Sequence, residues 1–160
     1  MRRNDRAKDL AFSLELIDRC SHGVMALTDE ENTPYCLPLS FVRIERNLYF
    51  HCAHQGRKIS ILRARPKVCV TFVGKDRPAY LEPAEYTTFY QSVIVNGHAE
   101  EVTEAEEKIC ALRALCQKLT PHAMDGDKFD LAIAKSLSVT GVWKVSMDEI
   151  SGKEKQEKQR

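Results

Sequence analysis

The sequence predicts a mainly β protein with helices (α+β class), built around an antiparallel barrel of six strands. Short runs of β-branched and aromatic residues alternate with polar turns through the middle of the chain, as in strands joined by hairpins. Apolar residues at helical spacing lie near both ends and indicate flanking helices. A length of 160 residues suits one domain, which we place at residues 1–150.

The first element is predicted to be a helix that starts from a cap at Asn4 or Asp5 and runs to about Cys20. Its apolar residues recur at i, i+4 and i+7, so they form one stripe that can pack on the barrel. The stripe comprises Leu10, Leu14 and Ile17.

The six strands are predicted at residues 23–28, 35–42, 47–53, 68–73, 89–102 and 139–147. A short helix follows Gly56. A second helix, opened by a capping box of Thr103 with Glu106, runs to about residue 119, and a third covers about 127–137. Prolines and charges at 74–88 predict a loop, and the lysine- and glutamate-rich residues 151–160 predict a disordered tail.

Charge and composition exclude several partners and locations. The 24 Lys and Arg residues nearly balance the 23 Asp and Glu residues, so no overall field attracts nucleic acid or an anionic membrane surface. The sequence contains no apolar run of membrane-spanning length and does not open like a signal peptide, so we expect a cytoplasmic protein. Its 6 widely spaced cysteines are expected to be small core residues, with no metal site.

The segment from His51 to Lys58 is the most informative one. Gly56 permits a tight turn, and Arg57 and Lys58 stand where the next helix begins. Free backbone N–H groups at a helix start, with two cations beside them, suit a phosphate dianion. Solvated surface charges have the same pattern, so this segment alone leaves both interpretations open.

Strand alternation predicts that His51 points away from the core. Leu48, Phe50 and Cys52 share one face, suited to the barrel interior, so Tyr49 and His51 share the opposite face. A titratable group beside Tyr49 on an outward face fits a ligand cleft at a dimer interface, and it also fits plain solvent exposure.

Three further segments accompany this one in a characteristic order. They are Pro34–Val42, Arg63–Val68 and Tyr90–Ala99. Together they resemble the FMN-binding split-barrel family related to pyridoxamine 5′-phosphate oxidase, and most closely its branch of Nim-type nitroimidazole-resistance proteins. The opening Met1-Arg2-Arg3 and the closing Ile150-Ser151-Gly152-Lys153 also look like that branch, so the resemblance covers nearly the whole chain.

This resemblance implies a homodimer that holds FMN at its interface. Arg57 and Lys58 match positions that hold the flavin phosphate, and His51 matches a histidine at the flavin cleft. Further residues match two strands of the family, one that runs along the isoalloxazine ring of the flavin and one that contacts the polar edge of this ring. The implied cofactor-binding residues are Leu37, Pro38, Leu39, Ser40, Phe50, His51, Arg57, Lys58, Gln91 and Ser92.

Two departures from the family bear on the substrate. The arginine that vitamin B6 oxidases carry on the strand matching residues 37–41 is absent, and Trp143-Lys144-Val145 replaces a Trp-Arg-Leu ending. Pyridoxamine phosphate oxidation is therefore not expected. Arg65 also stands where the family commonly has asparagine before its proline.

The sequence thus favours an FMN-dependent reductase of small planar acceptors such as nitroaromatic or nitroimidazole compounds, with His51 as the catalytic residue, either a proton donor or a hydrogen-bond partner near the ring. No GxGxxG motif is present, so a nicotinamide cofactor binds transiently or not at all. The alternatives are a flavin- or haem-binding protein or redox sensor without turnover, and a dimeric α+β module in which the motif residues are incidental.

Overall fold

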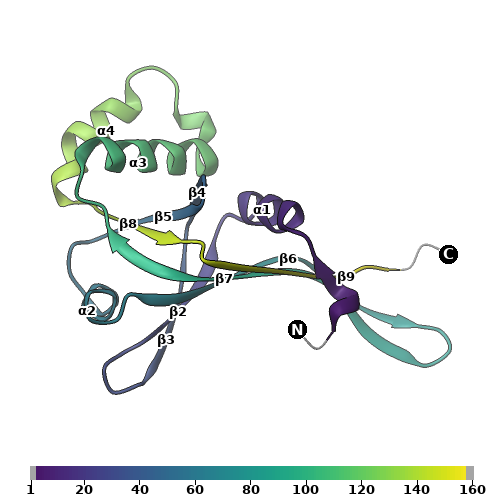
Figure 1. The fold of residues 1–160 in the computed structure, drawn as a ribbon. Helices are drawn as coiled ribbons and strands as arrows, with labels where there is room; N and C mark the ends of the chain where they lie inside the picture. Colours follow the sequence, from purple (N-terminus) through teal and green to yellow (C-terminus); the bar gives the residue numbers. More distant parts are fainter. Residues whose placement is uncertain (1–2, 158–160) are drawn as a thin grey trace.

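The structure is a computed structural model that describes residues 3–157, and its strands form one nine-stranded sheet (Figure 1). The strand order is β3-β2-β6-β7-β8-β5-β4, with β9 paired to β7 and β1 to β9, and every pairing is antiparallel. The strands are β1 Ala7–Lys8, β2 Gly23–Thr28, β3 Pro34–Leu39, β4 Val42–Ile44, β5 Asn47–Cys52, β6 Lys67–Leu81, β7 Glu85–Glu101, β8 Gly141–Ser146 and β9 Glu149–Lys155.

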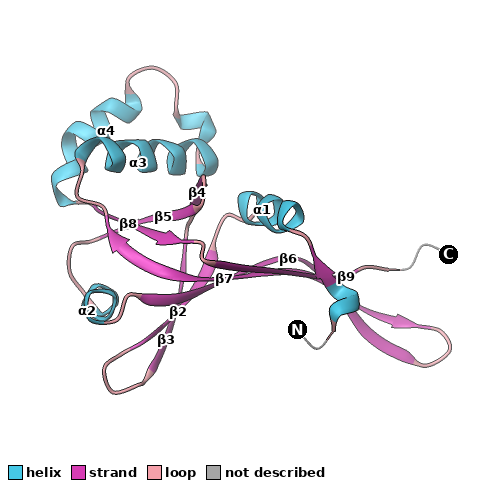
Figure 2. Cartoon of the chain, viewed as in Figure 1, coloured by secondary structure: helices cyan, strands magenta, loops and turns pink. Residues whose placement is uncertain are grey.

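Four α-helices and three short 3-10 turns accompany this sheet in the described residues (Figure 2). The α-helices are α1 Leu10–Arg19, α2 Arg57–Ala64, α3 Ala105–Leu119 and α4 Lys128–Ser136. The 3-10 turns are η1 Asn4–Arg6, η2 Pro121–Ala123 and η3 Leu137–Val139. The α+β class and the antiparallel split barrel predicted from sequence are confirmed.

The barrel is split because its sheet does not close. The strands β3 and β4 are the two ends of the hydrogen-bonded path, and only the two residues Ser40 and Phe41 join them. The strand β7 holds the halves together, since residues 90–96 pair with β9 and residues 99–101 pair with β8. Between these stretches lies Gly97, where any Cβ would collide with the Ser146 carbonyl.

Three phenylalanine rings fill the centre of the core. The Phe41 ring lies 5.6 Å from that of Phe50 and 5.8 Å from that of Phe72, in both cases edge to face. All three are fully buried, and α1 and α2 add their apolar faces to the same cluster. Trp143, expected in the core or an interface, is a buried member of this core.

A second, smaller core lies between α3 and the side of β4, β5 and β8 that points away from the main core. Its members are Val42, Tyr49, Val102, Ala111, Leu115 and Val142. The predicted amphipathic helix at 105–119 therefore covers the half of the sheet that α1 does not cover (Figures 1 and 2).

The predicted loop at 74–88 is wrong, because these residues form a hairpin arm. The ladder from Asp76–Tyr90 to Leu81–Glu85 continues β6 and β7 past a bulge that follows Val73. Figure 1 shows this arm projecting beyond β9. Pro78 lies in a two-stranded ribbon, where each strand has a free edge and a missing N–H is tolerated.

The disordered tail predicted from residue 151 is also wrong for residues 151–155, which belong to β9. Its charged residues find partners, since the buried Glu154 pairs with Lys8 at 2.8 Å. Composition indicated disorder, but cross-strand pairing and these ion pairs outweigh it. Residues 158–160 of the predicted tail lie outside the described residues.

Smaller differences concern helix caps and cysteines. The first α-helix begins at Leu10, because the Asp9 carboxylate accepts the Phe12 N–H at 2.9 Å, and not from Asn4 or Asp5. The N-cap of α3 is Glu104, without the expected capping box. The 6 cysteines are all free, and none is fully buried. None of the helices in residues 3–157 is long and apolar enough to cross a membrane.

Phe41→Ala is expected to lower the free energy of unfolding by about 3–5 kcal/mol, because it opens a cavity between the two remaining rings. Urea denaturation followed by circular dichroism measures the change. Leu131→Ala on the exposed side of α4 is the matched control and should stay within about 0.5 kcal/mol of wild type. Equal losses in the two variants would contradict a central role for Phe41.

Candidate flavin-phosphate site at the start of α2

The start of α2 has an unusual backbone geometry. Gly56 caps the helix at φ +124° and ψ 167°, a combination that essentially only glycine adopts. No atom lies within 4 Å of the position that its Cβ would take, so open space precedes the helix. The Gly56 carbonyl accepts the N–H groups of Ile59 and Ser60, whereas the first N–H groups of a helix have no partner within it.

Two cationic side chains flank this space, each stacked on an aromatic ring. The Arg57 guanidinium lies 4.7 Å from the centre of the Tyr35 ring on β3, and the Lys58 ammonium lies 5.3 Å from that of Phe50 on β5. The sequence-predicted residues Phe50, Arg57 and Lys58 are therefore brought together. Helix dipole, free N–H groups and two cations give this end of α2 the chemistry of an anion site.

The β2–β3 turn is fastened to α2 at both ends of the helix. Arg57 pairs with Asp29 at 3.4 Å, and Arg65 donates to the Asn32 side chain at 2.8 Å and to the Glu30 carbonyl at 3.2 Å. The Thr33 N–H, with Arg57 as a second cause, lowers the pKa of the Asp29 carboxyl. Arg65, which departs from the family pattern, thus keeps the turn against α2.

Sequence reasoning missed Asp29, Tyr35 and Arg65 as neighbours of the predicted phosphate residues. Their contacts depend on how a hairpin turn docks on a helix 28 residues away in sequence, as between Asp29 and Arg57. No local spacing signals such a contact. The sequence shows only that an acidic residue, Asp29, lies in a turn and that an aromatic residue, Tyr35, lies on a strand, without indicating that either contacts Arg57.

The four predicted residues of the ring-facing strand lie at the split of the barrel. Leu37 and Leu39 are half-buried against the main core, Pro38 is exposed, and Ser40 lies in the corner between β3 and β4. Among the described strands, β3 pairs with β2 alone, so its other edge presents free backbone groups.

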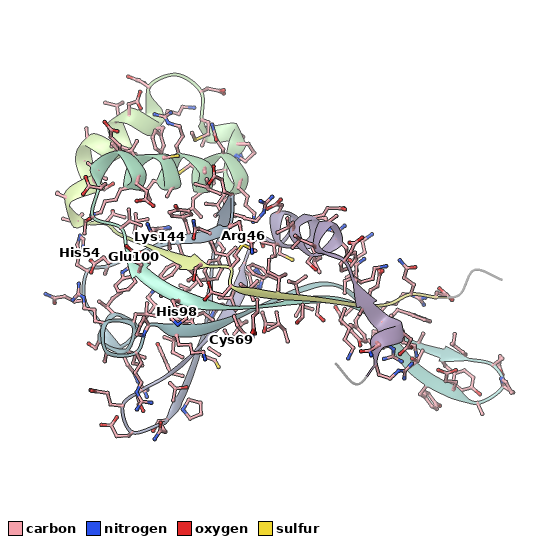
Figure 3. The ribbon with its side chains drawn as sticks, in the orientation of Figure 1. Arg46, His54, Cys69, His98, Glu100 and Lys144 are labelled. Atoms are coloured by element: carbon pink, nitrogen blue, oxygen red, sulfur yellow. The ribbon has the colours of Figure 1, made fainter. Side chains whose placement is uncertain are left out.

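His51 is exposed on β5, as strand alternation predicts. The expectation that Tyr49 flanks a ligand cleft with it is wrong, because α3 covers Tyr49. Its hydroxyl donates to the Glu107 carboxylate at 2.9 Å, and burial together with this carboxylate raises the pKa of Tyr49 to about 12. Lys144 contacts the same Glu107 at 3.3 Å and Glu100 at 3.7 Å (Figure 3).

Gln91 and Ser92 lie far from the start of α2. Tyr35 pairs with Leu27, and the next row of the sheet joins Ala26 to Cys69 and Asn96. Along β7, Gln91 is five residues from Asn96, at ~3.3 Å per residue. Across the sheet, β7 is three strands from β3, at ~4.8 Å per strand. Gln91 therefore lies roughly 20 Å from Tyr35. One chain does not bring these two groups of residues into contact.

The two residues also point to opposite faces of β7. The Gln91 side chain accepts from Arg19 of α1 at 2.8 Å and donates to Glu154 at 2.6 Å. Burial opposes ionisation of Glu154, but hydrogen bonds from Gln91, Lys8 and Gln156 outweigh it and lower the pKa of this carboxyl. Gln91 and Glu154 line a cavity of about 1040 Å³ at the base of the arm.

Ser92 belongs to the face of the sheet that points away from α1, which we call the outer face. Val24, Val73 and Ile94 are 42%, 60% and 41% exposed on it, on β2, β6 and β7. The register joins Val24 through Thr71 to Ile94 in one row. Figure 3 shows Cys69 and His98 on the side of β6 and β7 opposite α1. The outer face thus carries three exposed apolar side chains among polar ones.

The family model described as pyridoxamine 5′-phosphate oxidase matches residues 10–154. No curated protein matches the chain. A candidate 5-nitroimidazole antibiotic resistance protein from Bacteroides thetaiotaomicron is 26% identical, with a TM-score of 0.78 over 91% of this chain and 84% of that one.

Two further solved structures share the fold at lower identity. A flavocytochrome from Azotobacter vinelandii is 22% identical, with a TM-score of 0.82 over 98% of this chain and 72% of that one. An FAD and haem binding protein from Mycobacterium smegmatis is 20% identical, with a TM-score of 0.81 over 95% of this chain and 74% of that one.

Proposed function

Since the chain belongs to the pyridoxamine 5′-phosphate oxidase family, a flavin-binding family, we propose that it binds FMN and reduces small planar acceptors such as nitroaromatic compounds. The observation that carries the proposal is the start of α2, where open space in front of Gly56 meets Arg57 and Lys58. The 26% identity to a candidate nitroimidazole resistance protein supports this class of acceptor.

The start of α2 fits one phosphate group. Backbone N–H groups and the positive end of the helix dipole face the space, and two cations can each form a charge-assisted hydrogen bond there. Arg57 and Lys58 hold the phosphate. The Tyr35 ring stacks on the Arg57 side chain, and the Phe50 ring stacks on the Lys58 side chain. A single cradle of this kind supports FMN, which ends in one phosphate, in preference to FAD.

The free edge of β3 fits the flavin ring. The edge of β3 that β2 does not occupy presents backbone groups of the segment from Leu37 to Leu39, in which Pro38 contributes only a C=O group. The ring carries donors and acceptors along one side, which such an edge can satisfy. Ser40 adds a hydroxyl at the end of this strand.

A second copy of the chain completes the site in this proposal. Ser92 lies on the outer face, whereas Tyr35, which supports Arg57, faces the core side of the sheet. A ligand held by Arg57 therefore reaches Ser92 most directly when that serine comes from another subunit. The exposed Val24, Val73 and Ile94 give the outer face the apolar surface that a homodimer buries.

FMN supplies the hydride transfer when it is bound, and the chain supplies position and protons. His51 is exposed on the face of β5 opposite to Phe50, and its imidazole can give a proton to the acceptor. A nicotinamide nucleotide serves as a transient electron donor. We place the protein in the cytoplasm, where its 6 free cysteines stay reduced.

Arg57→Ala combined with Lys58→Ala is expected to weaken FMN binding by roughly 30-fold or more, because two charge-assisted contacts worth about 2 kcal/mol are lost. Quenching of flavin fluorescence during titration measures the affinity. Arg113→Ala, which removes a surface arginine paired with Asp130, is the control and should bind like wild type. Unchanged affinity in the double variant would refute the phosphate site.

His51→Ala is expected to keep bound FMN but to reduce a nitroimidazole with NADPH about 100-fold more slowly, since a positioned proton donor contributes at least this factor. Stopped-flow absorbance measures flavin reduction and reoxidation separately, and only reoxidation by the acceptor should slow. His122→Ala in η2 is the control. A yellow wild-type protein that consumes no acceptor would instead favour flavin storage or sensing.

Ile94→Lys is expected to convert the dimer to a monomer, because it places a charge in the middle of the proposed interface. Sedimentation velocity measures the mass, and flavin titration should show weaker binding in the same variant. Leu131→Lys changes an equally apolar, exposed residue on α4 and should leave the dimer intact. Dissociation without loss of FMN affinity would show that each copy holds its flavin alone.

A further inference from the structure

One lysine ties together three elements at the split of the barrel. The ammonium of Lys118, near the end of α3, donates to the Ile17 carbonyl of α1 at 3.1 Å and to the Phe41 carbonyl at 2.9 Å. These acceptors lie 101 and 77 residues away in sequence. No other side chain in the described residues donates a hydrogen bond to either carbonyl.

Both carbonyls need a partner from outside their own elements. Ile17 is in the last turn of α1, where the final carbonyls have no intrahelical donor, and a cation is favoured there by the helix dipole. Phe41 lies between β3 and β4, outside both ladders. A single ammonium with three donors can serve the two acceptors at once, which a methyl or thioether group cannot.

We propose that Lys118 is a positioning residue for the flavin ring, which it serves by fixing the corner Ser40–Phe41. This inference rests on the proposed function, in which the ring lies along Leu37 to Ser40. The corner directly follows that segment, and no sheet hydrogen bonds join β3 to β4 across it.

The corner is held on two sides. The Phe41 side chain is locked between the rings of Phe50 and Phe72, and the Phe41 carbonyl is locked by Lys118. These two constraints on Phe41 set the position of the neighbouring Ser40 and of the free edge of β3. With the carbonyl released, the corner keeps its buried ring but regains rotation of the Phe41–Val42 peptide, to which this carbonyl belongs.

The charge of Lys118 is disfavoured by its burial, so we attribute the role of this residue to the position of its hydrogen bonds. Burial lowers the pKa of Lys118, so folding disfavours its charged form. Asp18 and Cys20 act against this effect and Arg43 adds to it, while Arg43 itself pairs with Asp18 at 2.5 Å. Burial of this ammonium costs hydration energy that its two hydrogen bonds offset, and these bonds define where the corner lies.

Lys118→Met tests the proposal, with Lys108→Met on the same helix as the matched control. Flavin fluorescence titration of the full chain should show FMN affinity about tenfold weaker in Lys118→Met and unchanged in Lys108→Met. Lys118→Arg, which retains several donors, should recover part of the loss. Thermal unfolding without flavin should move by no more than about 4 °C in Lys118→Met.

Two outcomes overturn the proposal. The first is FMN affinity in Lys118→Met within twofold of wild type. The second is a large drop in melting temperature that Lys118→Arg reverses while affinity follows stability alone, which identifies a purely structural contact. Amide hydrogen exchange of residues 37–44 gives a readout without flavin, and it should be faster in Lys118→Met.

Failure of the proposed function gives a different result. Wild-type protein that binds no FMN removes the flavin site, while hydrogen exchange at residues 37–44 still decides whether Lys118 orders the corner. Unchanged exchange in Lys118→Met then refutes the positioning role by itself.

Discussion

The edge-to-face packing of Phe41 with Phe50 and Phe72 is the interaction on which the rest of the structure depends. The three residues come from the β3–β4 corner, from β5 and from β6, so they connect the two halves of a sheet that hydrogen bonds leave open. A split barrel needs such a centre because its two end strands do not stabilise each other. The same packing fixes the position of the free edge of β3. It also fixes the Phe50 ring, on which the Lys58 ammonium is stacked.

The parts of the fold that could be predicted were those with a local signal. Alternation on β5 placed His51 outside, and the Gly56-Arg57-Lys58 segment marked the start of α2 correctly. The arm and β9 could not be predicted in the same way. Both are rich in charge and turn-forming residues. The two sides of the arm become strands because they pair with each other, and β9 becomes one because it pairs with β7. Pairing across the sheet is a property of tertiary structure, which short windows of sequence do not contain.

The candidate site was predictable to the same degree. Residues close in sequence, Phe50, Arg57 and Lys58, are close in space, whereas Gln91 and Ser92 are remote and face opposite sides of β7. Tyr49 shows how a correct parity argument gave a wrong environment, since its face of β5 is covered by α3. Alternation tells which side a residue takes, but not what packs on that side.

The pairing of β7 has a consequence for how the sheet folds. One edge of β7 pairs with the preceding β6, and the other edge pairs with β8 and β9, which come later in the chain. In these later pairings Ala99 lies opposite Val145 and Tyr90 lies opposite Lys155. Until β8 and β9 have paired with it, the β6–β7 hairpin exposes a long unpaired edge. Folding of the sheet therefore depends on non-local contacts, which form slowly because long loops must close first.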